Sequence, residues 1–201
     1  MSDQVTFNFY LGLLAFRDEN YKKADEHLEF ALKHCHRGAK RNERVILEYL
    51  VPIKMLKGIM PSEALFKRHT ELEKTYDPFV AAIRSGNVGA YDQSLVKHQN
   101  YLLRRGTYLI MEHIREISIR TLFYKVYVLG GENSRMPIPL FKEALKLADI
   151  DVETAEVECI LANMIYSNYI KGYLSHQHLM LVLRKQQPFP KVSTTTATIV
   201  N

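Results

Sequence analysis

Through residues 1–130, apolar residues recur at every third or fourth position, and Gly, Asn or Pro interrupts the pattern at about the length of a helix. This spacing places apolar side chains on one face of a helix, so this part of the chain is predicted to be one helix after another. From Met136 the pattern changes. Two short helical segments are followed by residues that alternate between apolar and polar, which is typical of half-buried strands.

The first two helices are predicted to cross closely. Gly12 in the first helix and Ala24 and Ala31 in the second are small, whereas Leu28 between them is large, and residues 18–20 supply a polar turn. This arrangement of small and large residues matches one tetratricopeptide-like repeat. A single helical pair cannot bury both of its faces, so we expect it to stack on neighbouring helices.

One neighbour is visible after this pair, and none is visible before it. Residues 45–56 form an apolar stripe with a kink expected at Pro52 and an end at Gly58. On the other side, an apolar rim has no helix to cover it. The uncovered residues are Phe7, Phe9, Tyr10 and Leu13. We therefore expect that the array either is truncated at its N-terminus or docks there on a partner.

Further helices are predicted up to the change of pattern. A second pair runs over residues 78–103 with its turn at residues 85–87, and a longer helix runs over residues 108–129. The glycines at 130 and 131 end that helix.

The C-terminal third has the order of elements found in a winged helix. A short helix over residues 137–148 precedes Asp151, which is expected to be the N-cap of a second helix with an apolar stripe over residues 157–165. Alternating residues over 170–174 and 179–183 predict a small hairpin.

These elements divide the chain into three predicted parts. Residues 1–135 form a helical-repeat part, residues 136–187 form the winged helix, and residues 188–201 are rich in Pro, Ser and Thr without periodicity and are predicted to be disordered. The predicted fold class is all-α with a small C-terminal β-hairpin, in which tetratricopeptide-like helical repeats are followed by a winged helix.

A helical array that leads through one long helix into a winged helix resembles the PCI domain family, whose members are subunits of the proteasome lid, the signalosome and a translation-initiation factor. The motifs that carry the resemblance are Ala82-x-x-x-Gly86-Asn87-x-x-x-Tyr91-x-x-x-Leu95, Glu156-Val157-Glu158-x-Ile160 and Ile170-x-Gly172-Tyr173-Leu174. The resemblance covers nearly the whole chain.

Residues 30–61, 159–178 and 185–190 narrow the resemblance to PCI proteins of a TREX-type nuclear complex that couples transcription to mRNA export. It implies a non-enzymatic scaffold subunit without a cofactor, located in the nucleus, with shuttling to the cytoplasm and association with nuclear pores left open. It also implies two protein partners: a large PCI-bearing scaffold of the Sac or GANP type, and a small acidic DSS-type protein wrapped on the helices.

The charge is concentrated in the helical part. The chain holds 27 Lys and Arg against 22 Asp and Glu, a net charge of +5. The densest basic cluster follows the first helical pair, and Arg104 and Arg105 form a second. The predicted partner-binding residues are Lys33, Arg37, Arg41, Arg44, Arg104 and Arg105. Two interpretations stay open: a solvated cluster that favours the negative end of a helix dipole, or a site for phosphate or an acidic partner.

Charge is segregated within the winged helix. Five acidic residues lie between Asp149 and Glu158, around the start of the second helix. A recognition helix reads bases with its N-terminal residues, so an acidic start argues against sequence-specific binding. Contact with phosphates from the side of the hairpin remains, and we expect RNA or DNA to bind there without sequence preference. The predicted nucleic-acid-binding residues are Lys142, Lys146, Lys171, Arg184 and Lys185.

The sequence offers no arrangement of catalytic or metal-binding residues. It has no Gly-rich phosphate loop with Lys, no Gly-x-Ser-x-Gly elbow and no His-Glu-x-x-His helix. The His-Cys-His run at residues 34–36 cannot converge on one ion, because adjacent helical positions point about 100° apart. His176 and His178 are too few ligands for zinc, and the acidic residues of 149–153 lack the glycine of a calcium loop.

No segment is long enough to cross a bilayer. The longest stretches without charge, residues 4–16 and 159–170, fall short of the ~20 apolar residues that a span needs. Asp3 stands where a secretory signal carries positive charge, so we expect no membrane association and a location in the cytosol or nucleus. Cys35 and Cys159 lie among periodic apolar residues and are predicted to be buried thiols.

Two other functional classes stay open beside the mRNA-export subunit. A PCI subunit of a proteasome-lid, signalosome or initiation-factor-like assembly has the same fold but a different partner. A freestanding winged-helix transcription regulator is disfavoured by the acidic start of the second helix and by the large helical array.

Overall fold

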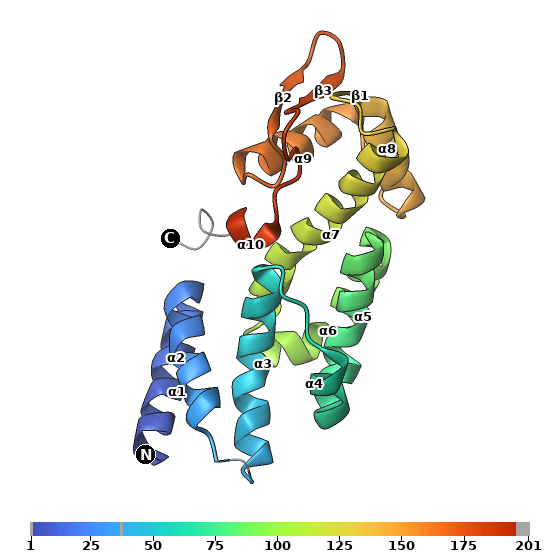
Figure 1. Cartoon of the computed structure of the whole chain (residues 1–201). Coiled ribbons are helices and arrows are strands. Elements are labelled where there is room, and N and C mark those ends of the chain that lie inside the picture. Colours follow the sequence, from blue (N-terminus) through green and yellow to red (C-terminus); the bar gives the residue numbers. More distant parts are fainter. Residues whose placement is uncertain (1, 37, 196–201) are drawn as a thin grey trace. The chain divides into compact units, whose positions relative to one another are not determined.

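The computed structural model describes residues 2–36 and 38–195 (Figure 1). The helices are α1 (Ser2–Arg17), α2 (Tyr21–His34), α3 (Lys40–Leu56), α4 (Glu63–Arg68), α5 (Thr70–Ser85), α6 (Val88–Arg105), α7 (Tyr108–Leu129), α8 (Ile138–Leu147), α9 (Thr154–Tyr166) and α10 (Val192–Thr195). The strands are β1 (Arg135–Pro137), β2 (Gly172–Ser175) and β3 (Met180–Leu183). The predicted fold class is confirmed: helical repeats precede a winged helix with a small antiparallel sheet.

The described residues form two compact units. The first holds residues up to Asp77 together with His98–Ile114, and the second holds Pro78–Lys97 and the chain from Arg115 onward. Helices α5, α6 and α7 each contribute residues to both units. The predicted boundary at residue 135 stays a prediction.

The close crossing of α1 and α2 in the first unit is confirmed. A Cβ on Gly12 would lie 2.8 Å from Cγ of Leu28, and Ala24, Leu28 and Ala31 are fully buried. The turn between the helices ends at Asn20, whose side chain accepts a hydrogen bond from the Lys23 backbone N–H at 3.1 Å. Because Gly12 has no side chain, Leu28 can pack directly against the backbone of α1.

Helix α3 forms the centre of the first unit, and Pro52 lies inside it as predicted. Nearly all of its residues from Ile46 to Leu56 are buried. The fully buried Tyr76 of α5 donates a hydrogen bond from its hydroxyl to the Glu48 carbonyl oxygen at 3.0 Å. Gly58, with a φ of +75°, follows the helix in the left-handed conformation that ends helices.

The second helical pair begins earlier than predicted. Helix α5 starts at Thr70 and includes Pro78, which was expected to open the helix. Upstream residues already follow the helical pattern, since Leu72, Thr75 and Tyr76 are buried. The turn at residues 85–87 is confirmed, and so are both ends of α7.

The core of the second unit joins its helical segments to the winged helix. Phe79 of α5 meets Tyr91 of α6 edge to face, with ring centroids 5.0 Å apart. Phe123 of α7 meets Phe141 of α8 in the same geometry at 5.0 Å. Such an aromatic pair stabilises the fold by about 0.5–1.5 kcal/mol beyond the contribution of its buried surface area. Within this unit, the first pair joins α5 to α6, and the second anchors α8 on α7.

The winged helix has one strand more than predicted. The three-stranded sheet has the order β1-β3-β2, and both pairings are antiparallel (Figure 1). Strand β1 is three residues long and ends in Pro137, so it lacks the run of alternating residues that signals a strand. The N-cap of α9 is Glu153, and the prediction of Asp151 was wrong. The Glu156 side chain accepts a hydrogen bond from the Glu153 N–H at 3.0 Å, which closes the first turn.

The predicted disorder from Pro188 is wrong for residues 188–190, which pack on the second unit. The Pro188 carbonyl accepts a hydrogen bond from the Lys171 N–H at 2.8 Å, and the Pro190 carbonyl accepts one from Arg120 of α7 at 2.6 Å. The Phe189 ring lies 5.5 Å from the rings of Tyr124 and Tyr127. Composition alone suggested disorder, but Phe189 buries apolar surface against α7. Residues 196–201 lie outside the described part.

Two further sequence expectations concern cysteines and membranes. Neither thiol is buried: Cys35 is half-buried at the end of α2 and Cys159 is exposed on α9, so that prediction was wrong. None of the helices in the described part of the chain combines the length and the apolar character that a membrane crossing requires.

Candidate partner and nucleic-acid surfaces

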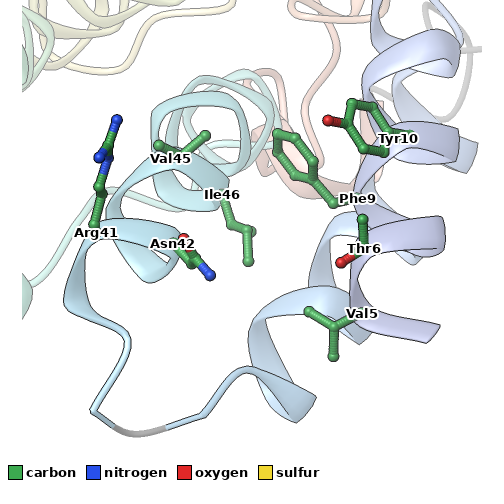
Figure 2. Close-up of a pocket in the computed structure, with 8 residues that line it drawn as sticks. All are labelled: Val5, Thr6, Phe9, Tyr10, Arg41, Asn42, Val45 and Ile46. Carbon is green, nitrogen blue, oxygen red and sulfur yellow. The ribbon is translucent and has the colours of Figure 1, made fainter. Parts of the chain in front are cut away.

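An apolar groove lies between α1 and α3 in the first unit. It has a volume of about 220 Å³. Its lining residues are Val5, Thr6, Phe9, Tyr10, Arg41, Asn42, Val45 and Ile46. Figure 2 shows the side chains of Phe9, Val5 and Ile46 reaching into the space between the two helices, with Arg41 at the far side of α3.

Aromatic contacts hold the wall of this groove in place. The Phe9 ring lies 5.5 Å from Tyr10 and 6.3 Å from Tyr49 of α3, and Tyr49 in turn lies 5.4 Å from the buried Phe16. Phe9 is therefore half-buried rather than fully uncovered, as is Leu13. Of the predicted apolar rim, Phe7 and Tyr10 are exposed, and Leu14, which the prediction did not include, is exposed beside them; all three are more than 60% exposed.

A basic pocket lies beside the groove. It has a volume of about 360 Å³, and Arg41 lines both cavities. The lining residues are Lys40, Arg41, Arg44, Arg68, His69, Thr70 and Glu71. Apolar surface next to an excess of positive charge fits an acidic chain with apolar anchors, because charge steers the encounter and apolar contacts hold the complex.

The two basic clusters that the sequence left separate meet at one buried carboxylate. Glu48 of α3 is 2% exposed. The Arg105 Nε lies 3.1 Å from its Oε2, and the Arg44 Nε lies 3.7 Å from its Oε1. Burial raises the pKa of the Glu48 carboxyl, although Arg105 and Arg44 oppose the shift. Arg44 also pairs with Glu71. Both arginines therefore neutralise the buried Glu48 carboxylate.

The other predicted partner-binding residues point outward. Lys33 in the last turn of α2, Arg41 in the first turn of α3 and Arg104 at the end of α6 are exposed. Arg37 lies outside the described residues. The structure thus separates the clusters into arginines that support the fold and cations that a partner can reach.

The predicted nucleic-acid-binding residues all lie in the second unit. Lys142 and Lys146 lie one turn apart on α8 and are half-buried and exposed respectively. Lys171 precedes β2, and its carbonyl accepts a hydrogen bond from the Arg184 N–H at 2.9 Å, so these two residues are neighbours. Arg184 and Lys185 are exposed after β3.

The start of α9 is acidic, as predicted. Glu153 and Glu156 are exposed at its first turn, and Glu158 accepts a hydrogen bond from His176 at 2.9 Å. The Glu158 contact ties α9 to the tip of the hairpin. A phosphate backbone would be repelled from this end of the helix.

The candidate metal ligands of the sequence do not gather into a site within the described part of the chain. There, no three His, Cys, Asp or Glu side chains gather as ligands for a metal ion. In the His-Cys-His run, the His34 Nδ1 lies 2.9 Å from the Phe30 carbonyl and the His36 Nδ1 accepts the Gly38 N–H at 3.1 Å. These histidines complete the end of α2.

Sequence reasoning missed two features of these surfaces. Asp25 of α2 is buried and binds both Lys54 of α3 and Lys57, which follows α3, with Nζ to oxygen distances of 2.9 and 2.6 Å. These ion pairs hold α2 against the C-terminal end of α3. The second feature is a pocket that includes Arg135 on the exposed face of the sheet. No periodic signal marks either feature, because each depends on residues far apart in the chain.

Comparison with known proteins agrees with this architecture. Residues 95–185 match the PCI domain. PCI domain-containing protein 2 of Xenopus laevis is 43% identical over 195 residues, which cover 96% of this chain and 48% of that protein. Its Drosophila melanogaster homolog is 38% identical over 194 residues, covering 96% and 48%.

A protein of another name is also similar. Protein CSN12 homolog of Schizosaccharomyces pombe is 39% identical over 195 residues, which cover 96% of this chain and 46% of that protein. The chain thus spans about half the length of the curated relatives it matches. Helical repeats, a three-stranded winged helix and these similarities lead to one conclusion: the chain contains a PCI domain and is similar to PCI domain-containing protein 2.

Proposed function

We propose that this chain is a non-enzymatic scaffold subunit of a nuclear complex that couples transcription to mRNA export. The observation that carries the proposal is the apolar groove between α1 and α3 beside a basic pocket, a surface suited to binding protein. The similarity to PCI domain-containing protein 2 supports the scaffold role. The nuclear location and mRNA export follow from the TREX-type resemblance of the sequence.

Two protein partners belong to this proposal. A small acidic DSS-type protein binds the first unit, where Lys33, Arg41 and Arg104 are exposed and Arg41 borders the apolar groove. A large PCI-bearing scaffold of the Sac or GANP type is the second partner. A disordered acidic chain gains affinity from both charge and apolar anchors, and its association should weaken as salt rises.

The acidic partner is tested by charge reversal at the exposed cations only. The triple variant Lys33→Glu, Arg41→Glu, Arg104→Glu should weaken binding of a purified acidic DSS-type protein at least tenfold and should flatten its salt dependence. Arg44 and Arg105 stay unchanged because they neutralise Glu48. The matched control reverses the exposed Lys22, Lys23 and Lys74. Equal affinity of wild type, triple variant and control would refute this binding surface.

Nucleic acid is the third proposed partner, bound weakly and without sequence preference. Lys142, Lys146, Lys171, Arg184 and Lys185 supply five charges, enough for about three to five phosphates, so log K should fall with log salt with a slope of about −2 to −4. The double variant Lys171→Glu, Lys185→Glu should weaken binding of both duplex and single-stranded nucleic acid. Glu153→Ala with Glu156→Ala, the control, should leave binding unchanged or slightly stronger. Loss of binding to one preferred sequence in that control would favour a transcription regulator.

A second candidate function has an observation in its favour. Relatives with nearly equal sequence identity to this chain carry two names, PCI domain-containing protein 2 and Protein CSN12 homolog. Sequence identity is therefore compatible with more than one assembly. A PCI subunit of a proteasome-lid, signalosome or initiation-factor-like assembly would use the same groove for another protein. Identification of the proteins that copurify with the tagged protein separates the two candidates.

A further inference from the structure

The outer face of the winged-helix sheet carries an open pocket. Residues on the inner face of the strands, Met136, Leu181 and Leu183, are buried beneath the sheet. The alternate residues face outward. In the register of the three strands, Tyr173 of β2 pairs with Val182 of β3, and Val182 pairs with Arg135 of β1. These three residues form one row across the outer face.

The pocket over this face has a volume of about 360 Å³, within the range of small-ligand sites. Its lining residues are Arg135, Tyr173, Ser175, His178, Met180 and Val182. The Tyr173 side chain is 63% exposed, so its ring is available to a ligand. The next row, Ser175 and Met180, continues the surface toward the hairpin tip.

The charge around the pocket is positive. The strands and the residues beside them, 132–137 and 170–185, contain Arg135, Lys171, Arg184 and Lys185 against the single acid Glu132. Among the described residues, no carboxylate forms an ion pair with Arg135. A ligand that combines flat apolar groups with negative charge complements this face.

We propose that this pocket binds single-stranded nucleic acid, with one base stacked on Tyr173 and a flanking phosphate bound by Arg135. The proposal rests on the nucleic-acid contact of the proposed function and deepens it by naming the form of the ligand. A base in a duplex has both of its faces covered by its neighbours, so only an unpaired base presents a face to the Tyr173 ring. Stacking tolerates any base, which agrees with binding without sequence preference.

This site differs in its chemistry from the proposed phosphate-binding surface, which is made of four lysines and one arginine. Backbone phosphates of either form of nucleic acid satisfy Lys171 and Lys185, whereas Tyr173 offers nothing to a duplex. Tyr173 therefore adds a preference for single strands to a surface that otherwise distinguishes little. The Tyr173 ring is the specificity-determining group, and Arg135 contributes charge.

The test measures binding of the full chain to a fluorescein-labelled single-stranded RNA and to a duplex of the same sequence, by anisotropy at one fixed salt concentration. Tyr173→Ala should weaken single-strand binding at least about fivefold and leave duplex binding within twofold. Tyr173→Phe, which keeps the ring, should bind as wild type. Tyr166→Ala is the matched control, because Tyr166 on α9 is 87% exposed and does not line the pocket.

Two further readouts keep the test decisive. Arg135→Gln should reduce the steepness of the single-strand salt slope by about 0.7, the value for one lost phosphate contact. An RNA with 2-aminopurine at a central position should lose fluorescence on binding to wild type and to Tyr173→Phe, but not to Tyr173→Ala. Thermal unfolding followed by circular dichroism establishes that each variant is folded.

The possible failures are distinguishable. In one outcome, Lys171→Glu with Lys185→Glu weakens binding of both ligands, but Tyr173→Ala weakens binding of neither. The stacking site is then overturned, whereas the nucleic-acid surface stands and the outer face of the sheet is left for a protein. If Tyr173→Ala weakens both ligands equally, stacking is also overturned. If wild type binds neither RNA nor duplex, both this inference and the nucleic-acid part of the proposed function are overturned.

Discussion

At the scale of single residues, Glu48 shows how charge is used inside the first unit. Its carboxylate is buried on α3 and is held by Arg44 and Arg105. An ion pair of this kind is costly to bury, but the removal of one partner leaves an uncompensated charge. Arg44 and Arg105 are therefore needed for the fold, which is why the partner test leaves them intact.

The pKa of Glu48 gives a pH prediction with a definite sign. Burial raises the pKa of this carboxyl in the folded state. The folded state then binds the proton more tightly than the unfolded chain, so this group favours folding at acid pH and the benefit is lost as pH rises through the folded pKa. Relative to Glu48→Gln, wild type should lose free energy of unfolding as pH rises above the ordinary pKa of a glutamate. Urea unfolding of both proteins over a pH series measures the difference. If instead the free energy of unfolding of wild type, relative to Glu48→Gln, increased with pH, the two arginines would lower the pKa of Glu48 by more than burial raises it.

Gly12 gives a second prediction at this scale. A side chain there must displace the fully buried Leu28, because a Cβ would lie 2.8 Å from its Cγ. Gly12→Val should lower the free energy of unfolding by about 1–3 kcal/mol. Gly38→Ala is the control, since its Cβ would meet only the exposed His36 side chain. Equal stability of the two variants in urea would contradict the close crossing of α1 and α2.

At the scale of elements, periodicity predicts what is local and misses what is distant. The sequence pattern around α7 predicted both ends of that helix correctly. The small residues of α1 and α2 predicted the close crossing of these two helices. Strand β1 was missed because three residues ending in Pro137 pair with β3 far along the chain. The candidate sites follow the same rule. Exposed cations were identified from sequence, whereas the role of Arg105 depended on Glu48, 57 residues earlier.

The segment 188–190 gives a prediction about element packing. Phe189 packs on Tyr124 and Tyr127, and Pro188 binds the backbone of Lys171. Phe189→Ala should lower the free energy of unfolding by about 1–3 kcal/mol and speed amide hydrogen exchange at Lys171. Gln187→Ala, an exposed neighbour, is the control. Unchanged exchange at Lys171 in Phe189→Ala would show that the segment does not hold β2.

The exposed outer face of α1 gives a prediction about self-association. Phe7, Tyr10 and Leu14 are exposed together on one helix, and an apolar face of this kind promotes association. The triple variant Phe7→Ser, Tyr10→Ser, Leu14→Ser should raise the monomer fraction of the chain in light scattering after size exclusion. Val96→Ser, which changes an exposed apolar residue on α6, should have no such effect. If wild type is already monomeric at high concentration, the face does not drive association.

At the scale of the whole molecule, a PCI domain is combined with three candidate binding surfaces: the groove and its basic neighbour, the basic residues of the winged helix, and the outer face of the sheet. We propose that each surface binds another molecule and catalyses no reaction. A scaffold subunit is expected to lose its associations when these surfaces change, while its fold remains.

The most direct test of the scaffold role is purification of the tagged protein from nuclei with identification and quantification of what copurifies. We predict that a large PCI-bearing protein and a small acidic protein copurify in near-equal amounts, and that the acidic protein is lost in the Lys33→Glu, Arg41→Glu, Arg104→Glu variant. Recovery of proteasome-lid, signalosome or initiation-factor subunits in their place would contradict it.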